Sequence, residues 1–182
     1  LPSPQTFVTA GRLSTQKNHA LLLEALALVR QRHDAHLVLL GEGPLRSLLR
    51  DQSERLGIEH AVHFWGWQDN PYAIMAAASA YVSTSDFEGF PNAVIEAQAC
   101  GAPVLSTTCP YGPEEIITHG VDGLLCDMGN APQLAALMSQ LIVDQRGREA
   151  IAQKGAERVR RFDASVIVDK YAQVFDEAMA AI

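Results

Sequence analysis

The sequence predicts one α/β domain in which helices cover both faces of a six-stranded parallel sheet. Two features of the chain predict this fold. Short apolar runs alternate with longer segments of helical periodicity from one end of the sequence to the other. The runs are apolar at successive positions, which is typical of strands buried on both faces of a parallel sheet. The length of 182 residues suits one domain, and no linker-like segment divides it.

The six predicted strands are the apolar, β-prone runs. In chain order they are Thr6–Thr9, His36–Leu40, Ala61–Phe64, Ala80–Ser83, Pro103–Thr107 and Gly123–Cys126.

The helices are predicted from apolar residues spaced three and four apart. Leu22, Ala25, Leu26 and Val29 give one apolar face to a helix over Asn18–Arg32. A second helix is predicted around Leu45, Leu48, Leu49 and Leu56. The others are predicted at Pro71–Ala78, Asn92–Cys100, Pro113–Thr118, Ala131–Leu141, Arg146–Arg160 and Asp163–Ala178.

Composition restricts the class of function. The net charge of −7 argues against a nucleic-acid-binding protein, which would carry a basic surface. The three cysteines have no CxxC spacing and follow a pattern typical of reduced buried thiols, so we expect a cytoplasmic location. The six histidines lack the spacing of zinc ligands, and we expect no metal site.

The ends of the chain and its apolar runs bear on targeting. The chain opens Leu-Pro-Ser-Pro with no recognisable leader and no initiator Met, from which we expect a piece of a longer protein. Its apolar runs are far shorter than the roughly 20 residues that a membrane-spanning helix needs.

A pair of basic residues follows the first predicted strand. Gly11-Arg12-Leu13 and Lys17 lie between that strand and the next helix, at the carboxyl edge where parallel sheets bind ligands. An arginine fork, a lysine and a helix start together form a suitable clamp for a diphosphate. The alternative is a solvated pair of surface cations.

The segment from Glu88 to Glu96 is the most informative stretch of the sequence. Its two carboxylates lie on either side of a predicted strand-to-helix turn, and each can accept hydrogen bonds from a pair of vicinal hydroxyls. Gly89 allows a ligand close to the backbone, and Pro91 suits the first turn of a helix. The alternative for Glu96 is a buried structural charge with a protein partner.

These motifs, taken in order, resemble the C-terminal domain of the retaining glycosyltransferases of family 4 (group 1), which have the two-domain GT-B architecture. The resemblance covers nearly the whole chain. It rests on Gly11-Arg12-Leu13 with Lys17, Gly41-Glu42-Gly43, Phe64-Trp65-Gly66, Glu88-Gly89-Phe90-Pro91 with Glu96, Gly112–Ile116 and Gly120–Leu125.

The resemblance implies a Rossmann-like donor site for a nucleotide sugar. Arg12 and Lys17, after Gly11, would stabilise the charge of the leaving diphosphate. Glu88 would face the hydroxyls of the donor sugar, and we count these three side chains as catalytic. The amides of Gly89, Phe90 and Asn92, around Pro91, would hold the sugar and phosphate.

The same resemblance assigns the nucleoside. Glu96 would bind the ribose diol, and the backbone at Trp65 and Trp67 would read the edge of the base. Gly41 and Gly43 would leave room for that base. UDP-sugars are the favoured donors, with GDP- and ADP-sugars as alternatives, and no metal or other cofactor is expected.

By the same resemblance, we expect this chain to supply the donor half of the family's architecture, without the acceptor domain. We therefore expect the 182-residue chain to bind a nucleotide weakly and to transfer nothing. The intact enzyme would act in glycan, polysaccharide or glycolipid synthesis, in the cytoplasm or at the inner face of the membrane through its other domain.

Three alternatives stay open at this point. A nucleotide-sugar epimerase or a glycogen-synthase-like relative shares the architecture. A non-catalytic nucleotide-binding module shares the donor site. A dinucleotide oxidoreductase is disfavoured, because the first strand is not followed by GxGxxG.

Overall fold

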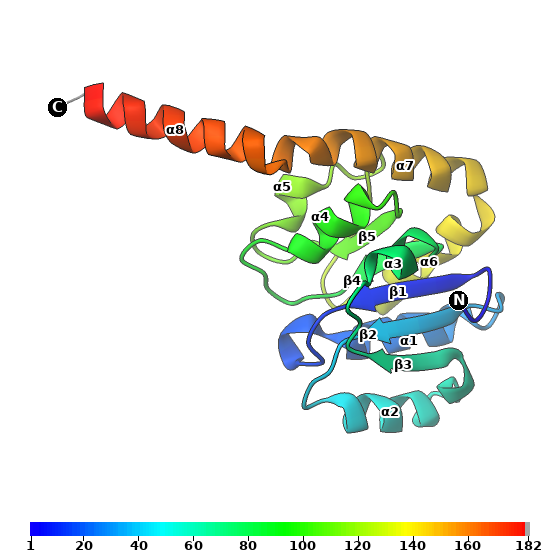
Figure 1. Ribbon diagram of the computed structural model, residues 1–182. Coiled ribbons are helices and arrows are strands. Elements are labelled where there is room, and N and C mark those ends of the chain that lie inside the picture. The colour runs from blue at the N-terminus through cyan, green and yellow to red at the C-terminus, as the bar shows by residue number, and fades with distance from the viewer. Residues whose placement is uncertain (181–182) are drawn as a thin grey trace.

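The computed structural model describes residues 1–180, and it confirms the predicted fold class. Helices lie on both sides of one six-stranded sheet (Figure 1). The strands are β1 (Thr6–Ala10), β2 (His36–Leu40), β3 (Val62–Gly66), β4 (Ala80–Ser83), β5 (Val104–Thr107) and β6 (Leu124–Cys126). The α-helices are α1 (His19–Val29), α2 (Arg46–Arg55), α3 (Tyr72–Ala76), α4 (Asn92–Ala99), α5 (Pro113–Ile116), α6 (Ala131–Val143), α7 (Gln145–Arg158) and α8 (Ala164–Ala180). Three 3-10 turns complete the elements: η1 (Thr15–Lys17), η2 (Glu59–Ala61) and η3 (Val159–Phe162).

The strand order determines where a ligand can bind. All strands pair in parallel, in the order β3-β2-β1-β4-β5-β6. The chain runs outward from β1 to β3, then returns to the centre at β4 and runs outward in the other direction. Beyond the carboxyl ends of β1 and β4, the connecting loops therefore diverge, and they leave the crevice in which open α/β sheets bind ligands.

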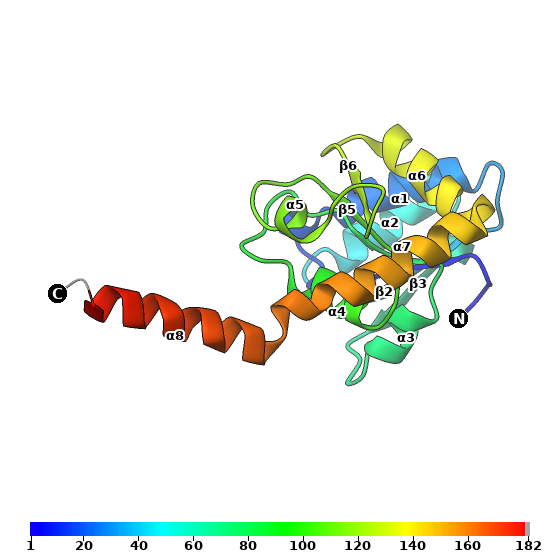
Figure 2. The ribbon, with the colours of Figure 1, turned by 90° about the horizontal axis from the view of Figure 1, so that it is seen from above.

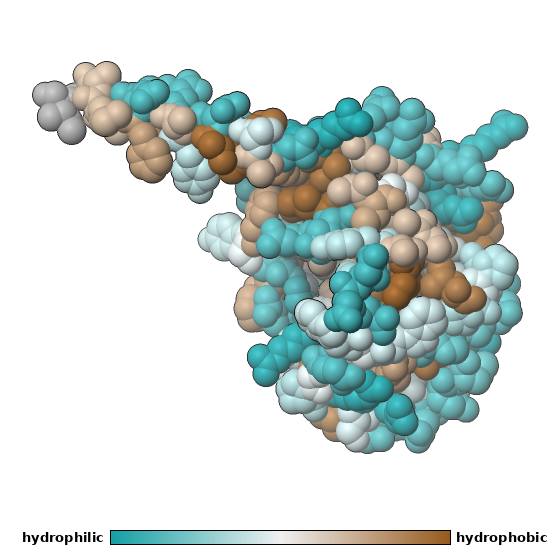
Figure 3. Space-filling model, viewed as in Figure 1, coloured by the Kyte–Doolittle hydropathy of each residue, from teal (hydrophilic) through white to brown (hydrophobic). Residues whose placement is uncertain are grey.

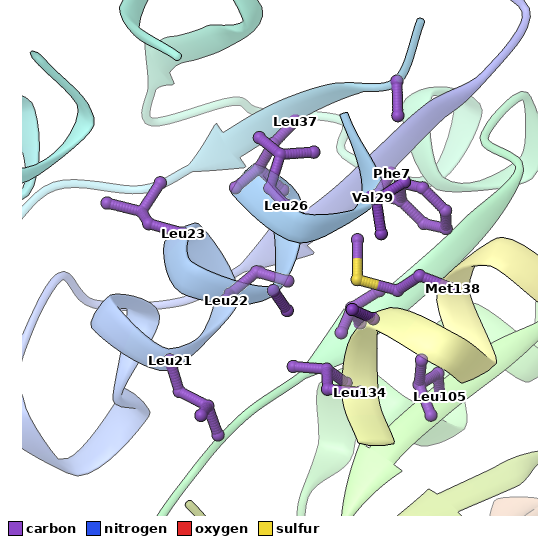
Figure 4. Packing of buried hydrophobic residues seen from close by; sticks show 14 of the residues in the cluster. Phe7, Leu21, Leu22, Leu23, Leu26, Val29, Leu37, Leu105, Leu134 and Met138 are labelled. Carbon is purple, nitrogen blue, oxygen red and sulfur yellow. The ribbon is translucent and has the colours of Figure 1, made fainter. Parts of the chain in front are cut away.

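Two apolar clusters hold the layers together. Alternate strand residues point to opposite faces, so Phe7 packs with α1 and α6 whereas Val8 packs with α3 and α4. Figure 4 shows Leu22, Leu26, Leu134 and Met138 meeting over the sheet in the first cluster. Each fully buried aliphatic side chain contributes about 1.5–3 kcal/mol, so these layers fix the geometry of the loops at the sheet edge.

Helix α8 differs from the other long helices because it leaves the body of the molecule (Figures 1 and 2). None of its described side chains is buried, and Tyr171 and Phe175 are each 63% exposed. Apolar side chains lie among the polar ones along its surface (Figure 3). No helix among residues 1–180 has the length and apolar character needed to cross a bilayer.

The predicted helices agree with the structure, but the predicted apolar face of α2 is partly wrong. Leu48 was assigned to the buried side of the second helix, yet it is 61% exposed, whereas Leu49 and Ser53 are the buried residues of α2. The error arises because α2 lies at the margin of the molecule beside the edge strand β3, where only a narrow stripe of the helix meets the sheet.

Candidate functional site

The loop after β1 begins the site. Gly11 has a φ of +154° and donates its amide to the Leu40 carbonyl at 2.9 Å, which joins this loop to the end of β2. Leu13 is fully buried and anchors the loop, whereas the intervening Arg12 is exposed. The Arg12 guanidinium has no ion-pair partner among residues 1–180, so it remains available to an anion.

Lys17 and Glu88 lie together where the loops after β1 and β4 meet. Lys17 Nζ is 2.6 Å from Glu88 Oε1, and Ser85 Oγ donates to the same oxygen at 2.6 Å. The Glu88 side chain is only 8% exposed and that of Lys17 is 24% exposed. The sequence predicted that both residues belong to one site, but it did not predict that they pair with each other.

Further hydrogen bonds hold these two loops in register. The Asp86 amide donates to the Gln16 carbonyl at 2.9 Å, and Gln16 Nε2 donates to the Phe87 carbonyl at 3.0 Å. Asn18 Nδ2 donates to Asp86 Oδ1 at 2.8 Å. These contacts fix the Lys17–Glu88 pair relative to the sheet.

A cleft of about 580 Å³ opens beside this pair, over the carboxyl ends of β1, β2 and β3. It brings together five residues that the sequence assigned to the donor site: Gly11, Arg12, Gly41, Trp67 and Glu96. Its other lining residues are Ala10, Leu40, Glu42, Gln68, Asp69, Pro71, Tyr72, Met75 and Ala93. A mainly apolar floor with a few charged groups at the rim suits a nucleoside.

The aromatic wall of the cleft is Trp67, whose side chain is 77% exposed. Its indole Nε1 donates to Asp69 Oδ1 at 3.3 Å, which orients the ring. Sequence patterns do not reveal Asp69 or Tyr72 as residues of the cleft, because their positions depend on the path of the loop between β3 and α3.

Trp65 lies elsewhere. Its side chain lines a separate pocket of about 420 Å³ formed by β3 and α2 with Arg50 and Phe64. Its carbonyl accepts a hydrogen bond from Gln68 Nε2 at 3.0 Å. The two tryptophan side chains therefore line different pockets. The predicted base contacts concern the backbone at these positions, where the Trp65 carbonyl already accepts a hydrogen bond.

Gly41 and Gly43 have a structural reason to be glycine. A Cβ on Gly41 would lie 2.1 Å from the Gly11 carbonyl oxygen, and one on Gly43 would lie 2.3 Å from that of Leu13. The space was predicted to be for the base, but the backbone of the β1 loop occupies it. Gly43 does not line the cleft, whereas Gly41 does.

The turn into α4 is only partly available to a ligand. The Asn92 amide, predicted to bind sugar or phosphate, instead donates to the Phe90 carbonyl at 2.9 Å. Within residues 1–180 the amides of Gly89 and Phe90 have no such acceptor. Pro91, which suits the first turn of a helix, is instead the N-cap of α4 and lies one residue before that turn. The Phe90 ring packs edge-to-face on the Phe162 ring, with the ring centroids 5.5 Å apart.

Burial affects the titration of groups beneath the site. Tyr81 is buried and donates to the Ala10 carbonyl at 3.2 Å, and burial raises the pKa of its phenol. Burial, followed by the nearby Glu88 carboxylate, raises the pKa of the Cys109 thiol. The phenol and the thiol are therefore both neutral near pH 7.

The fold is that of a Rossmann-like α/β domain with a cleft at the carboxyl edge of its parallel sheet. The sequence profile of "Glycosyl transferases group 1" matches residues 2–158. The chain belongs to this family.

Two curated relatives are similar over most of the chain. A lipopolysaccharide core biosynthesis glycosyltransferase of Rhizobium meliloti, LpsD, is 34% identical over 95% of this chain and 50% of its own length. A 4-alpha-N-acetylgalactosaminyltransferase of Campylobacter jejuni, which acts on a diphospho-undecaprenol substrate by its name, is 35% identical over 86% of this chain and 42% of its own length. The chain thus spans about half the length of these relatives.

Solved structures extend the similarity to the fold. Anabaena HepE in complex with UDP is 28% identical, with a TM-score of 0.89 over 95% of this chain and 49% of that one. HepE has also been solved in complex with UDP-glucose. The lipopolysaccharide outer core galactosyltransferase WaaB is 27% identical, with a TM-score of 0.82 over 96% of this chain and 50% of that one.

Proposed function

We propose that this chain is the donor-binding half of a retaining glycosyltransferase that transfers a sugar from a nucleotide diphosphate sugar to an acceptor. The observation that carries the proposal is the convergence of Arg12 and Glu96 on one cleft, beside the Lys17–Glu88 pair. On this proposal Arg12, which has no ion-pair partner within residues 1–180, faces the diphosphate, and Glu96 faces the ribose diol.

The proposed catalytic contribution of this half is electrostatic. Arg12 and Lys17 stabilise the negative charge that develops on the leaving diphosphate, without a divalent metal ion. Lys17 is already close to Glu88, so an arriving phosphate shares the ammonium with that carboxylate. We expect activity of the intact enzyme to be insensitive to EDTA.

Glu88 suits a hydroxyl-binding role better than that of a covalent nucleophile. Its Oε1 accepts from both Lys17 and Ser85, and its side chain is almost buried. A nucleophile needs an accessible oxygen in line with the anomeric carbon, whereas a hydroxyl-binding carboxylate gains from being held rigidly. Retention of anomeric configuration is part of the proposal and is tested by NMR of the product.

A UDP-sugar is the proposed donor. The support comes from HepE, whose solved complexes contain UDP and UDP-glucose. Relatives named for lipopolysaccharide core biosynthesis and for a diphospho-undecaprenol acceptor support a role in polysaccharide or glycolipid synthesis. Their names are those of transferases, which favours transfer over the epimerase and the non-catalytic module.

The acceptor and any general base are proposed to lie in the half of the relatives' length that this chain does not span. On this proposal the 182-residue chain binds donor and transfers nothing. Association with the inner face of the membrane, if the acceptor is a lipid, belongs to that other half.

Saturation-transfer NMR and calorimetry of the chain with UDP, GDP, ADP and their glucose conjugates test the proposal. We expect UDP to bind most tightly, and we expect EDTA to leave its affinity unchanged. Binding to none of the nucleotides would overturn the donor-site assignment. Sugar transfer by the chain alone would overturn the division of labour between two halves.

A further inference from the structure

Tyr111 has a backbone conformation that no contact of its own side chain within residues 1–180 explains. Its φ is +65°, in the left-handed region that glycine and asparagine tolerate and aromatic residues rarely adopt. Asn18, the other non-glycine residue with positive φ among residues 1–180, uses its side chain to cap α1 by accepting from the Leu21 amide. Tyr111 has no comparable reason.

The Tyr111 side chain gains little from the protein itself. It is 78% exposed, and within residues 1–180 it has neither a side-chain hydrogen bond nor an aromatic partner. A glycine would fit this backbone with less strain. Strain of this kind, held in place by the surrounding structure, is typical of ligand-binding positions.

The neighbouring residues hold the Tyr111 backbone beside the Glu88–Pro91 turn. The next residue, Gly112, has a φ of +91°, and a Cβ there would lie 2.4 Å from Pro91 Cδ and 3.5 Å from the Gly89 carbonyl oxygen. On the other side, Cys109 is 2% exposed and anchors the loop in the protein interior. The β5–α5 loop therefore packs against the Glu88–Pro91 turn.

The strand order determines the direction in which the proposed nucleotide sugar extends along the edge of the sheet. The proposed contacts with base, ribose and diphosphate are in the cleft over β3, β2 and β1, and Glu88 follows β4. Neighbouring strands are about 4.8 Å apart, so β2 and β5 are separated by about 14 Å. An extended nucleotide sugar laid along this edge ends with its sugar between the β4 and β5 loops.

We propose that Tyr111 is a specificity-determining residue whose ring packs against the face of the donor hexose, on the side away from the diphosphate. This inference rests on the proposed donor-binding function. Hexopyranose rings present an apolar C–H face that matches the electron-rich face of an aromatic ring. Glu88 holds hydroxyls on one side of the sugar, and Tyr111 reads the shape and substituents of the other.

Calorimetry of the 182-residue chain with UDP and with a panel of UDP-glucose, UDP-galactose and UDP-N-acetylglucosamine tests this inference. For Tyr111→Gly we expect unchanged affinity for UDP. The affinity for the best-bound UDP-sugar should fall by about threefold to about tenfold. The preference among the three sugars should narrow. Tyr111→Phe should behave as the original chain, because it keeps the ring.

Controls separate this role from a structural one. Tyr111→Gly should not lower the melting temperature, since glycine suits the backbone, and Tyr171→Ala removes an exposed tyrosine from α8 without an effect on either ligand. If Tyr111→Gly leaves the ratio of UDP-sugar to UDP affinity unchanged, the inference is wrong. The same holds if the original chain binds UDP-sugars no better than UDP. Failure to bind UDP itself would instead overturn the proposed function.

Discussion

Lys17 Nζ and Glu88 Oε1 are 2.6 Å apart, although 71 residues separate them in the chain. Their ion pair joins the loops after β1 and β4, which are adjacent central strands. Because Glu88 is almost buried, the pair is screened less than a surface salt bridge. The ion pair places the Lys17 ammonium and the Glu88 carboxylate at the proposed junction between the diphosphate and the sugar.

A double-mutant cycle with Lys17→Met and Glu88→Gln measures this coupling. We expect an interaction free energy of about 1–2 kcal/mol in urea unfolding, above the usual value for an exposed pair, because water is largely excluded from the carboxylate. The i,i+3 pair of Lys154 and Glu157, which is about half exposed, is the matched control and should show clearly weaker coupling, because water surrounds it. Equal coupling in the two pairs would contradict the role assigned to burial.

Arg12→Ala should weaken UDP binding by about tenfold to about a hundredfold, since a charge-assisted hydrogen bond contributes roughly 1.5–3 kcal/mol. Uridine, which lacks the diphosphate, should bind the variant as well as it binds the original chain. Arg50→Ala, in the separate pocket beside β3, is the matched control and should leave both affinities unchanged. The assignment fails if Arg12→Ala weakens uridine and UDP alike.

The sequence predicted those parts of the site that depend on one short segment of the chain, and not those that depend on contacts between distant segments. The strand-helix order placed Arg12, Glu88 and Glu96 near the carboxyl edge, because periodicity and turn residues are local signals. The Lys17–Glu88 pair depends on how two distant loops approach each other, and periodicity carries no such information.

Two other differences have the same origin. Gly43 is required by the Leu13 backbone, a contact between loops that no spacing in the sequence reveals. Trp65 and Trp67 diverge because Gly66 between them has a φ of +71° and redirects the chain at the end of β3. The periodicity of α8 predicted a helix correctly, but it did not reveal that the apolar face leaves the body of the domain.

Gly89→Ala separates ligand contact from folding. A Cβ at Gly89 would meet nothing within 4 Å, and its φ is not positive, so the protein's own packing does not require glycine there. The free energy of unfolding should stay constant or rise by about 0.4–1 kcal/mol, because alanine restricts the unfolded chain. Binding of UDP-glucose should weaken, since the new methyl group occupies the space proposed for the sugar.

Gly43→Ala is the contrasting control for that experiment. Its Cβ would fall against Leu13 backbone atoms at 2.3–2.7 Å, so the loops must separate and the variant should unfold at lower urea concentration. Undiminished UDP-glucose binding by a fully folded Gly89→Ala variant would remove the Gly89 backbone from the donor site.

His19 makes the stability of the chain depend on pH. It is 2% exposed, its Nδ1 has no hydrogen-bond partner among residues 1–180, and burial, followed by Lys17, lowers its pKa from 6.5 to about 4. Below pH 6.5 the unfolded chain therefore binds a proton at His19, whereas the folded chain binds it only near pH 4. The free energy of unfolding consequently falls as the pH drops from 6.5 to about 4. The loss attributable to His19 is about 3 kcal/mol.

Urea unfolding of the original chain and of His19→Leu at pH 7.5, 6, 5 and 4 measures this contribution. The variant should lose less stability than the original chain on acidification, with the difference growing steadily below pH 6.5 and levelling off near pH 4, because leucine binds no proton. His33→Asn, at a histidine that is not buried, is the matched control for the removal of an imidazole. Parallel profiles for His19→Leu and the original chain would contradict the role assigned to His19, and acid sensitivity would then have to come from other groups, such as His63, whose pKa is also lowered by burial.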